Sequence, residues 1–234
     1  MTGVQTCALP ILDGADTIDG GAGGDTVDAG PGDDLVLGSS GADSLDGGTG
    51  INTLSYSDAN NGISINLSSG LANGGAFGND TFTGFINVIG SSLSDSIIGD
   101  TGNNSISGGG GEDTVTGGLG SNTLDGGGGV DVVTYQSLTS AVTVNLGARS
   151  ASGTGVTDTI TLFENVIGSS LSDSIIGDSG ANSIIGLDGA DTIDGGAGGD
   201  TVDANFTVLS VISADVPPIT IAKWYGGHAA VPKY

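Results

Sequence analysis

Residues 108–134 read GGGGEDTVT, GGLGSNTLD and GGGGVDVVT, three successive nine-residue units in one register. Each unit has a glycine-rich turn, then Asp or Asn at the sixth position, and an aliphatic residue at the eighth. Gly at the first, second and fourth positions permits positive φ and close backbone approach, as tight turns require. The three residues that end each unit predict a short strand whose middle side chain alone points inward. The stretch therefore predicts a solenoid with two units in each coil.

The same unit recurs through most of the chain. There are fourteen such units, the first beginning at Ile11. They form three blocks, which we assign to residues 12–55, 90–134 and 168–204. Across them the eighth residue is always Val, Ile or Leu, the fourth is Gly in 12 units, and the sixth is Asp in ten and Asn in four. This register predicts an all-β fold in which two parallel sheets enclose a thin ladder of aliphatic side chains.

Composition excludes several classes of protein. The 234 residues include 47 Gly, and 27 acidic residues face three basic ones, which gives a formal net charge of −24. A charge of this sign argues against nucleic acid and anionic membranes as partners. No apolar run is long enough to cross a bilayer, so we expect no membrane span. The single cysteine, Cys7, rules out a disulfide framework or a thiolate metal site.

The spacing resembles the GGxGxDxUx repeat of RTX (hemolysin-type) calcium-binding proteins. The resemblance implies a right-handed parallel β-roll, a β-solenoid whose Gly/Asp-rich turns bind several Ca²⁺ ions between successive coils. It also implies that the sixth-position carboxylates and turn carbonyls supply the ligand oxygens. Transferred to this sequence, the candidate metal ligands are Asp16, Asp25, Asp34, Asp43, Asp95, Asp113, Asp131, Asp173, Asp191 and Asp200.

Metal dependence is also expected from the composition of the repeat. One buried aliphatic side chain per nine residues returns less free energy than ordering those nine backbones costs. Carboxylates stacked every second unit repel one another, and a divalent cation would remove that repulsion. Oxygen ligands on flexible turns favour Ca²⁺ over Zn²⁺ or Mg²⁺, so folding should be coupled to external calcium. The alternative is that each Asp is a solvated residue in an Asx turn.

Departures from the repeat predict unequal sites. Units two apart share a face, so the second block places three Asp residues on one face and two Asn residues on the other. An Asn keeps a carbonyl ligand but lacks the charge that holds a divalent ion. Leu replaces the fourth Gly in the turns of Asp95 and Asp173, which weakens those two sites. The strongest site is expected between Asp113 and Asp131. The Asn residues are Asn52, Asn104, Asn122 and Asn182, and the ninth-position residues Asp19, Asp28, Asp46, Asp125 and Asp194 are expected to be solvated.

Two inserts separate the blocks. Residues 56–89 correspond to 135–167, and both run directly into the sequence GSSLSDSIIGD. Their alternating apolar residues, such as Ile63, Ile65 and Leu67, predict longer strands. We interpret the inserts as broader coils of the same solenoid rather than independent ligand-binding modules. Tyr56 and Tyr135, where each block ends, are expected to act as caps.

The two ends of the chain do not follow the repeat. Residues 1–11, MTGVQTCALPI, resemble the translation of a sequencing-library adapter and are interpreted as an artefact. Residues 205–234 form a tail that is either a cap or an assembly junction. A strand such as 206–212 would protect the open end of the solenoid.

Function is expected to be structural. The chain has one His and lacks GxSxG, HExxH and GxxxxGK[ST] motifs, so we expect no enzyme activity. The leading hypothesis is a calcium-binding module of a larger secreted bacterial protein, located outside the cell or at its surface, that folds on extracellular Ca²⁺ and acts as a spacer. A surface or matrix ligand would then belong to the parent protein. The alternatives are the non-catalytic C-terminal part of an exported protease or lipase, and a metal-independent adhesive solenoid.

Overall fold

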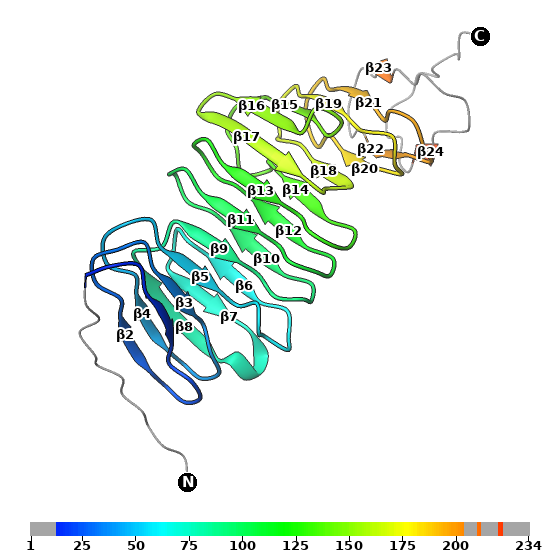
Figure 1. Cartoon of the computed structure of the whole chain (residues 1–234). Helices are drawn as coiled ribbons and strands as arrows, with labels where there is room; N and C mark the ends of the chain where they lie inside the picture. The colour runs from blue at the N-terminus through cyan, green and yellow to red at the C-terminus, as the bar shows by residue number, and fades with distance from the viewer. Residues whose placement is uncertain (1–12, 204–209, 212–219, 222–234) are drawn as a thin grey trace.

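The computed structural model covers the whole chain, and it describes residues 13–203, 210–211 and 220–221. These residues form an elongated roll of two 12-stranded sheets, here called sheets A and B, and the strands stack along the long axis (Figure 1). In spatial order, sheet A contains β1 (Thr17–Asp19), β3 (Leu35–Leu37), β5 (Thr53–Ser55), β9 (Asn87–Ile89), β11 (Ser105–Ser107), β13 (Thr123–Asp125), β17 (Val156–Thr161), β16 (Ser150–Gly153), β15 (Val142–Asn145), β19 (Ser174–Ile176), β21 (Thr192–Asp194) and β23 (Ser210–Val211). Sheet B contains β2 (Thr26–Asp28), β4 (Ser44–Asp46), β8 (Asn79–Thr83), β7 (Leu71–Asn73), β6 (Ser64–Asn66), β10 (Ser96–Ile98), β12 (Thr114–Thr116), β14 (Val132–Thr134), β18 (Asn165–Ile167), β20 (Ser183–Ile185), β22 (Thr201–Asp203) and β24 (Thr220–Ile221). One short 3₁₀ helix, η1 (Gly75–Phe77), lies between β7 and β8.

The repeat sets the register of the sheets. Strands two units apart pair in parallel, as where Ile97 of β10 faces Val115 of β12. The eighth-position side chain of each unit lies between the sheets and is almost fully buried, whereas its strand neighbours are mostly exposed or half-buried. The expected all-β roll with parallel sheets and an aliphatic ladder is therefore confirmed. The second block also divides as expected, because β10, β12 and β14 belong to sheet B and β11 and β13 to sheet A.

The two inserts depart from the parallel pattern. The first adds β6, β7 and β8 to sheet B, and the second adds β15, β16 and β17 to sheet A. In each, the middle strand, β7 or β16, is antiparallel to both neighbours, so the inserts interrupt the parallel pairing of the repeat blocks. The block between the inserts has five units, an odd number, so the second insert reaches the opposite sheet.

The long strands also differ from the sequence prediction. β6 covers only Ser64–Asn66, β15 has four residues, and the longest strands are β8, with five residues, and β17, with six. Each insert folds back as a meander, so its length is divided among three strands. Phe82 and Phe85 pack edge to face in the first insert, with ring centroids 6.0 Å apart.

The C-terminal end continues both sheets by one strand each. β23 pairs in parallel with β21, and β24 pairs in parallel with β22. The remaining residues of the predicted capping strand, 206–209 and 212, lie outside the described residues, as does the segment 1–11. Within the described ranges, no helix is long and apolar enough to span a membrane.

Candidate metal-binding turns

The sixth-position side chains lie in one repeated environment. Each sits at the end of a turn, directly before a strand. Nine of the ten predicted Asp residues are buried, and Asp16, in the first coil described, is half-buried. Carboxylic acids are seldom buried without partners, so each buried oxygen is expected to have a hydrogen-bond donor or a cation beside it.

One carboxylate oxygen of most of these residues links neighbouring coils. Asp113 Oδ1 accepts the backbone N–H of Asp95 at 2.8 Å, and Asp131 Oδ1 accepts that of Asp113 at 2.8 Å. The same bond joins Asp16 to Asp34, Asp25 to Asp43 and Asp173 to Asp191 across 18 residues. These side chains therefore form a ladder along each edge of the roll.

The second oxygen of most of these carboxylates has no donor. Oδ2 is buried and lacks a hydrogen-bond partner in Asp16, Asp25, Asp34, Asp43, Asp113, Asp131 and Asp191, and in Asp25 Oδ1 lacks one too. Buried polar atoms in proteins are almost always paired, so a row of unpaired carboxylate oxygens indicates that a cation completes these turns.

The pKa values of four of these carboxyl groups are raised. Burial is the main cause that raises the pKa of Asp43, Asp113 and Asp191 to about 6, and neighbouring carboxylates add to it. The ladder hydrogen bond acts in the opposite direction but does not cancel these effects. Burial also raises the pKa of Asp131, and the charge of Glu164 contributes. These four carboxyl groups therefore favour a bound cation or a proton over an isolated negative charge.

The first-position glycines leave room beside the free oxygens. A Cβ added to Gly108 would lie 2.3 Å from Asp113 Oδ2 and 2.5 Å from the carbonyl oxygen of Gly126 in the next coil. A Cβ on Gly186 would lie 2.4 Å from Asp191 Oδ2. A carboxylate oxygen and a backbone carbonyl of the next coil thus approach the same space beside Gly108.

The glycines of one turn have different roles. Gly109 and Gly111, at the second and fourth positions, have φ values of 101° and 109°, which side chains rarely adopt. Gly108, at the first position, has no positive φ and is needed for close packing alone. The expectation of positive φ at all three positions is therefore wrong for the first.

The donor set suits a hard cation. Among the residues the structure describes, no three His, Cys, Asp or Glu side chains converge on one point. Backbone carbonyls would have to supply the remaining ligands. Calcium accepts six to eight oxygen ligands, carbonyls included, in flexible geometry, whereas zinc prefers nitrogen and sulfur. The turns fit Ca²⁺, and an unpaired Oδ2 and nearby carbonyl oxygens would be its ligands.

The Asn side chains make hydrogen bonds through both their oxygen and their nitrogen atoms. Asn104 Oδ1 accepts the N–H of Asp100 at 3.0 Å, and its Nδ2 donates to the carbonyl of Ile86 at 3.0 Å. Asn122 Nδ2 donates to Asp158 Oδ1 at 2.9 Å. The amide therefore supplies a donor where Asp would present an unpaired oxygen.

The turns that contain Leu93 and Leu171 are completed in another way. Ser91 donates to Asp95 twice, from its N–H to Oδ2 at 2.5 Å and from its Oγ to Oδ1 at 2.9 Å. Ser169 makes the same two bonds to Asp173, at 2.6 and 2.8 Å. Neither carboxylate has an unpaired oxygen.

Sequence reasoning missed two members of the ladder. Asp80 Oδ1 accepts the N–H of Asp43 at 2.9 Å, and Asp158 Oδ1 accepts that of Asn122 at 3.0 Å. Both lie in the inserts and are buried. The sequence does contain a signal for both residues: each precedes Thr and a buried apolar residue, as in the regular units.

The insert tyrosines are partners of these two carboxylates. Tyr56 donates its hydroxyl to Asp80 Oδ2 at 2.7 Å, and Tyr135 donates to Asp158 Oδ2 at 3.2 Å. Both rings are 1% exposed, and burial is the main cause that raises both tyrosine pKa values. Tyr56 and Tyr135 are therefore core residues within the roll rather than caps at its end.

Glu164 is a further ladder residue that the sequence pattern did not indicate. Its Oε2 accepts the N–H of Asp131 at 2.8 Å. It precedes β18 as the sixth-position residues precede their strands, and the corresponding residue of the first insert is Ile86. Asp131 thus lies in the ladder between two acidic residues: its Oδ1 accepts the N–H of Asp113, and its own N–H donates to Glu164 Oε2.

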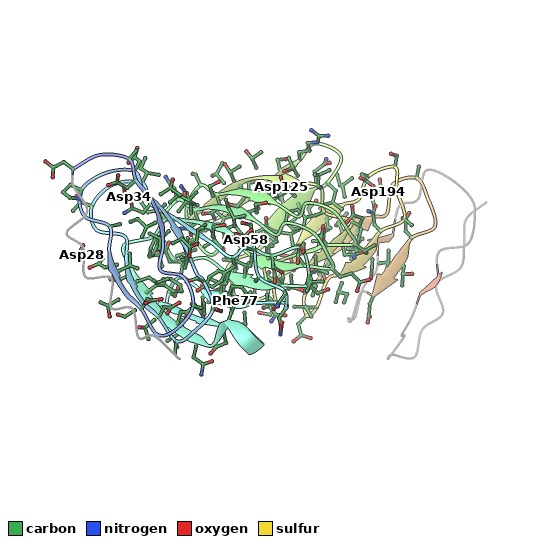
Figure 2. The ribbon with its side chains drawn as sticks, turned by 60° about the horizontal axis from the view of Figure 1, so that its bottom comes forward. Asp28, Asp34, Asp58, Phe77, Asp125 and Asp194 are labelled. Carbon is green, nitrogen blue, oxygen red and sulfur yellow. The ribbon has the colours of Figure 1, made fainter. Side chains whose placement is uncertain are left out.

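Ninth-position carboxylates lie at strand ends and are exposed or half-buried. Asp19, Asp46 and Asp194 each accept the N–H of the glycine two residues later. Figure 2 shows Asp28 toward one end of the roll and Asp125 and Asp194 farther along it.

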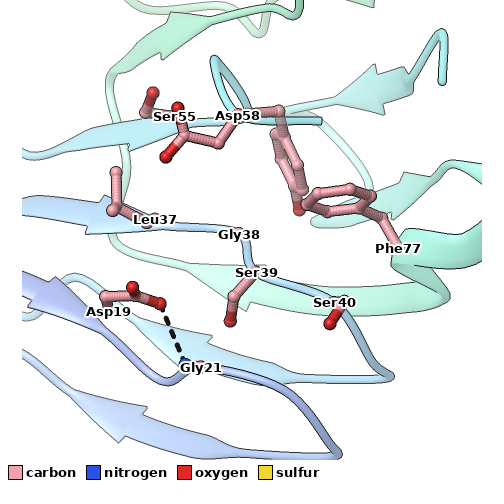
Figure 3. A pocket seen from close by; sticks show the side chains of 10 residues that line it. Asp19, Gly21, Leu37, Gly38, Ser39, Ser40, Ser55, Asp58 and Phe77 are labelled. Atoms are coloured by element: carbon pink, nitrogen blue, oxygen red, sulfur yellow. Dashed lines mark hydrogen bonds between the residues drawn. The ribbon is translucent and has the colours of Figure 1, made fainter. Parts of the chain in front are cut away.

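A separate pocket of about 220 Å³ opens near the first insert (Figure 3). Its lining includes Asp19, Asp58, Tyr56 and Phe77, and none of the sixth-position residues. The pocket is therefore distinct from the metal-binding turns.

The repeated turns, the ladder and the unpaired oxygens define a parallel β-roll with cation-binding turns. The model of the RTX calcium-binding nonapeptide repeat (4 copies) matches residues 12–36, 19–54, 89–124, 108–135 and 167–202, together more than half of the chain. The chain belongs to this family, whose repeats bind Ca²⁺. Its repeat domains are generally non-catalytic structural modules, and proteins that carry them are typically secreted. A search of curated proteins gives no match.

Proposed function

We propose that this chain is the calcium-binding β-roll module of a larger secreted bacterial protein, which folds on extracellular Ca²⁺ and serves as a stiff spacer. The observation that carries the proposal is the row of buried carboxylate oxygens without donors. Extracellular modules bind Ca²⁺ with Kd of about 10⁻⁴ to 10⁻³ M, so binding sites of this type would fill outside the cell.

The strongest site is proposed between Asp113 and Asp131. Both Oδ2 atoms are unpaired, the residues occupy successive coils of sheet B, and a carbonyl of the second coil approaches Asp113 Oδ2 beside Gly108. Asp16, Asp25, Asp34, Asp43 and Asp191 share the unpaired oxygen and are proposed as further ligands. Asp200 remains a candidate by its position, with Oδ1 accepting the N–H of Asn182 at 3.0 Å.

Calcium titration of two matched variants tests the site. Asp113→Ala removes an unpaired carboxylate oxygen from sheet B, and Asn122→Ala removes an amide from the neighbouring turn on sheet A. Isothermal titration calorimetry should show weaker or fewer calcium sites in Asp113→Ala and an unchanged number in Asn122→Ala. Equal loss in both variants would contradict the assignment.

Circular dichroism with and without Ca²⁺ tests the function as a whole. The sheet signal and melting temperature should fall when EGTA removes calcium and recover when calcium is restored. An unchanged spectrum and melting temperature would favour a metal-independent adhesive solenoid instead.

A further inference from the structure

Two 18-residue coils contain no buried side-chain oxygen or nitrogen without a hydrogen-bond partner. They are residues 90–107 and 168–185, here called the post-insert coils, and each directly follows an insert. The first reads GSSLSDSIIGDTGNNSIS and the second GSSLSDSIIGDSGANSII. Both therefore combine a Ser–Asp turn with an Asn turn.

The carboxylate of the Ser–Asp turn has three donors, two from its own turn and one from the preceding insert. Asp95 accepts from Ser91 N–H, from Ser91 Oγ, and from the N–H of Ile63 at 2.7 Å. Asp173 accepts from the two equivalent Ser169 groups and from the N–H of Val142 at 2.8 Å. By contrast, the only hydrogen bond described for the Asp113 carboxylate is the one from Asp95, which leaves Oδ2 unpaired.

The serine hydroxyl also shapes the turn. Ser91 Oγ accepts the N–H of Leu93 at 3.0 Å, and Ser169 Oγ accepts that of Leu171 at 3.1 Å. Neither leucine has a positive φ, in contrast to the fourth-position glycines Gly111 and Gly129. The GSSL sequence thus forms a different turn, one that directs its own donors at the carboxylate.

The Asn turn repeats between the two coils as well. Asn182 Oδ1 accepts the N–H of Asp178 at 2.9 Å, and its Nδ2 donates to the carbonyl of Glu164 at 2.7 Å. Asn104 makes the same pair of bonds, to Asp100 and Ile86. Each amide connects its own turn to the preceding coil.

Each post-insert coil adjoins an insert whose carboxylate is also paired. Asp80 and Asp158 are held by tyrosine hydroxyls, and neither has an unpaired oxygen. The unpaired oxygens are confined to other stretches of the described chain, in the turns that contain residues 16–43, 113–131 and 191 and at Asp203 in the last described coil.

We propose that the inserts and post-insert coils are calcium-independent anchors, in which serine, asparagine and tyrosine donors replace the ion, and that calcium orders the roll between them. This inference rests on the proposed calcium-dependent function, because it states which turns take no ion. It implies that the calcium-free chain keeps two folded segments that hold the register for the rest.

Hydrogen exchange measured by mass spectrometry on the full chain, in Ca²⁺ and in EGTA, tests the inference. In EGTA, the amides of β10, β11, β19 and β20 should exchange at least about tenfold more slowly than those of β2, β4, β12 and β14. In Ca²⁺ all of these strands should be protected. If every strand loses protection together in EGTA and regains it with Ca²⁺, the inference is wrong although the chain binds calcium.

A chain that neither binds Ca²⁺ nor changes its exchange with Ca²⁺ would overturn the proposed function, and the anchors with it. The double variant S91A/S169A removes both hydroxyl donors, and S92A/S170A is the matched control because those serines are exposed and adjacent. In EGTA, S91A/S169A should speed exchange in the post-insert coils by about tenfold or more, and the control should not. Equal behaviour of the two variants would contradict the role of the hydroxyls.

Discussion

Replacing Asp113 with Asn separates the hydrogen bond that Oδ1 accepts from the calcium binding proposed for Oδ2. Oδ1 accepts the N–H of Asp95 at 2.8 Å, and an asparagine oxygen can accept the same bond. Oδ2 has no donor, and an amide nitrogen in its place would lie near the carbonyl of Gly126. Asn104 already makes this kind of bond in the neighbouring turn. D113N should therefore remove a calcium ligand and stabilise the calcium-free fold.

The size of the stabilisation expected for D113N follows from the raised pKa of Asp113. Burial raises the pKa of Asp113 from 3.8 to about 6, and a shift of about two units corresponds to about 3 kcal/mol against the charged form at neutral pH. Water near the turn reduces this value, and a new amide hydrogen bond adds about 1 kcal/mol. We expect D113N to raise the free energy of unfolding in EGTA by about 2 kcal/mol.

Calcium should stabilise the wild-type protein more than D113N. With a Kd of about 10⁻⁴ to 10⁻³ M, one site adds about 1.5 to 3 kcal/mol in about 10 mM Ca²⁺, and D113N should lose this gain. Urea unfolding at neutral pH, in EGTA and in Ca²⁺, measures both effects. The reciprocal variant N122D is the control, and it should be less stable than wild type in EGTA because Nδ2 no longer donates to Asp158 Oδ1. The reasoning is refuted if D113N destabilises the calcium-free protein as much as D113A does.

Three further outcomes are expected. Gly108→Ala should abolish the adjacent calcium site and destabilise the roll by about 1–3 kcal/mol, because its Cβ would overlap Asp113 Oδ2. Gly128→Ala is the control: no atom lies within 4 Å of its Cβ, so Ca²⁺ binding measured by calorimetry should be unchanged. Tyr135→Phe leaves Asp158 Oδ2 without its donor, so urea unfolding should show a loss of about 1–3 kcal/mol in Ca²⁺ and in EGTA alike; a loss that calcium restores would contradict this. The calcium-free fold binds more protons than the unfolded chain between about pH 4 and 6, because pKa values such as that of Asp113 are raised to about 6, so its stability should fall as pH rises through this window. Melting temperatures in EGTA that rise across the same window would contradict the pH prediction.

The regular units were predictable from sequence because each coil contacts only its neighbours. The position of Val115 within its nonapeptide was enough to predict its burial and its pairing with the unit two places away. The division of Asp113 and Asn122 between opposite faces followed from the same period. The family resemblance then supplied calcium as the expected ion.

The inserts were less predictable because they fold by contacts outside the nine-residue period. Asp43 and Asp80 are 37 residues apart, and they become neighbours only because β6, β7 and β8 fold back on one another. The same fold buries Tyr56 against Asp80, which the position of Tyr56 at the end of a block did not indicate.

The sequence by itself determined the period, the two faces and the residue that each turn presents, because a local repeat places equivalent side chains equivalently. Only the tertiary structure decided which carboxylates lack a donor. Asp95 and Asp113 occupy the same position in their units, yet three donors reach the first and a single one is described for the second. Hydrogen-bond partners depend on turn geometry and on the adjacent coil, and neither can be read from one unit alone.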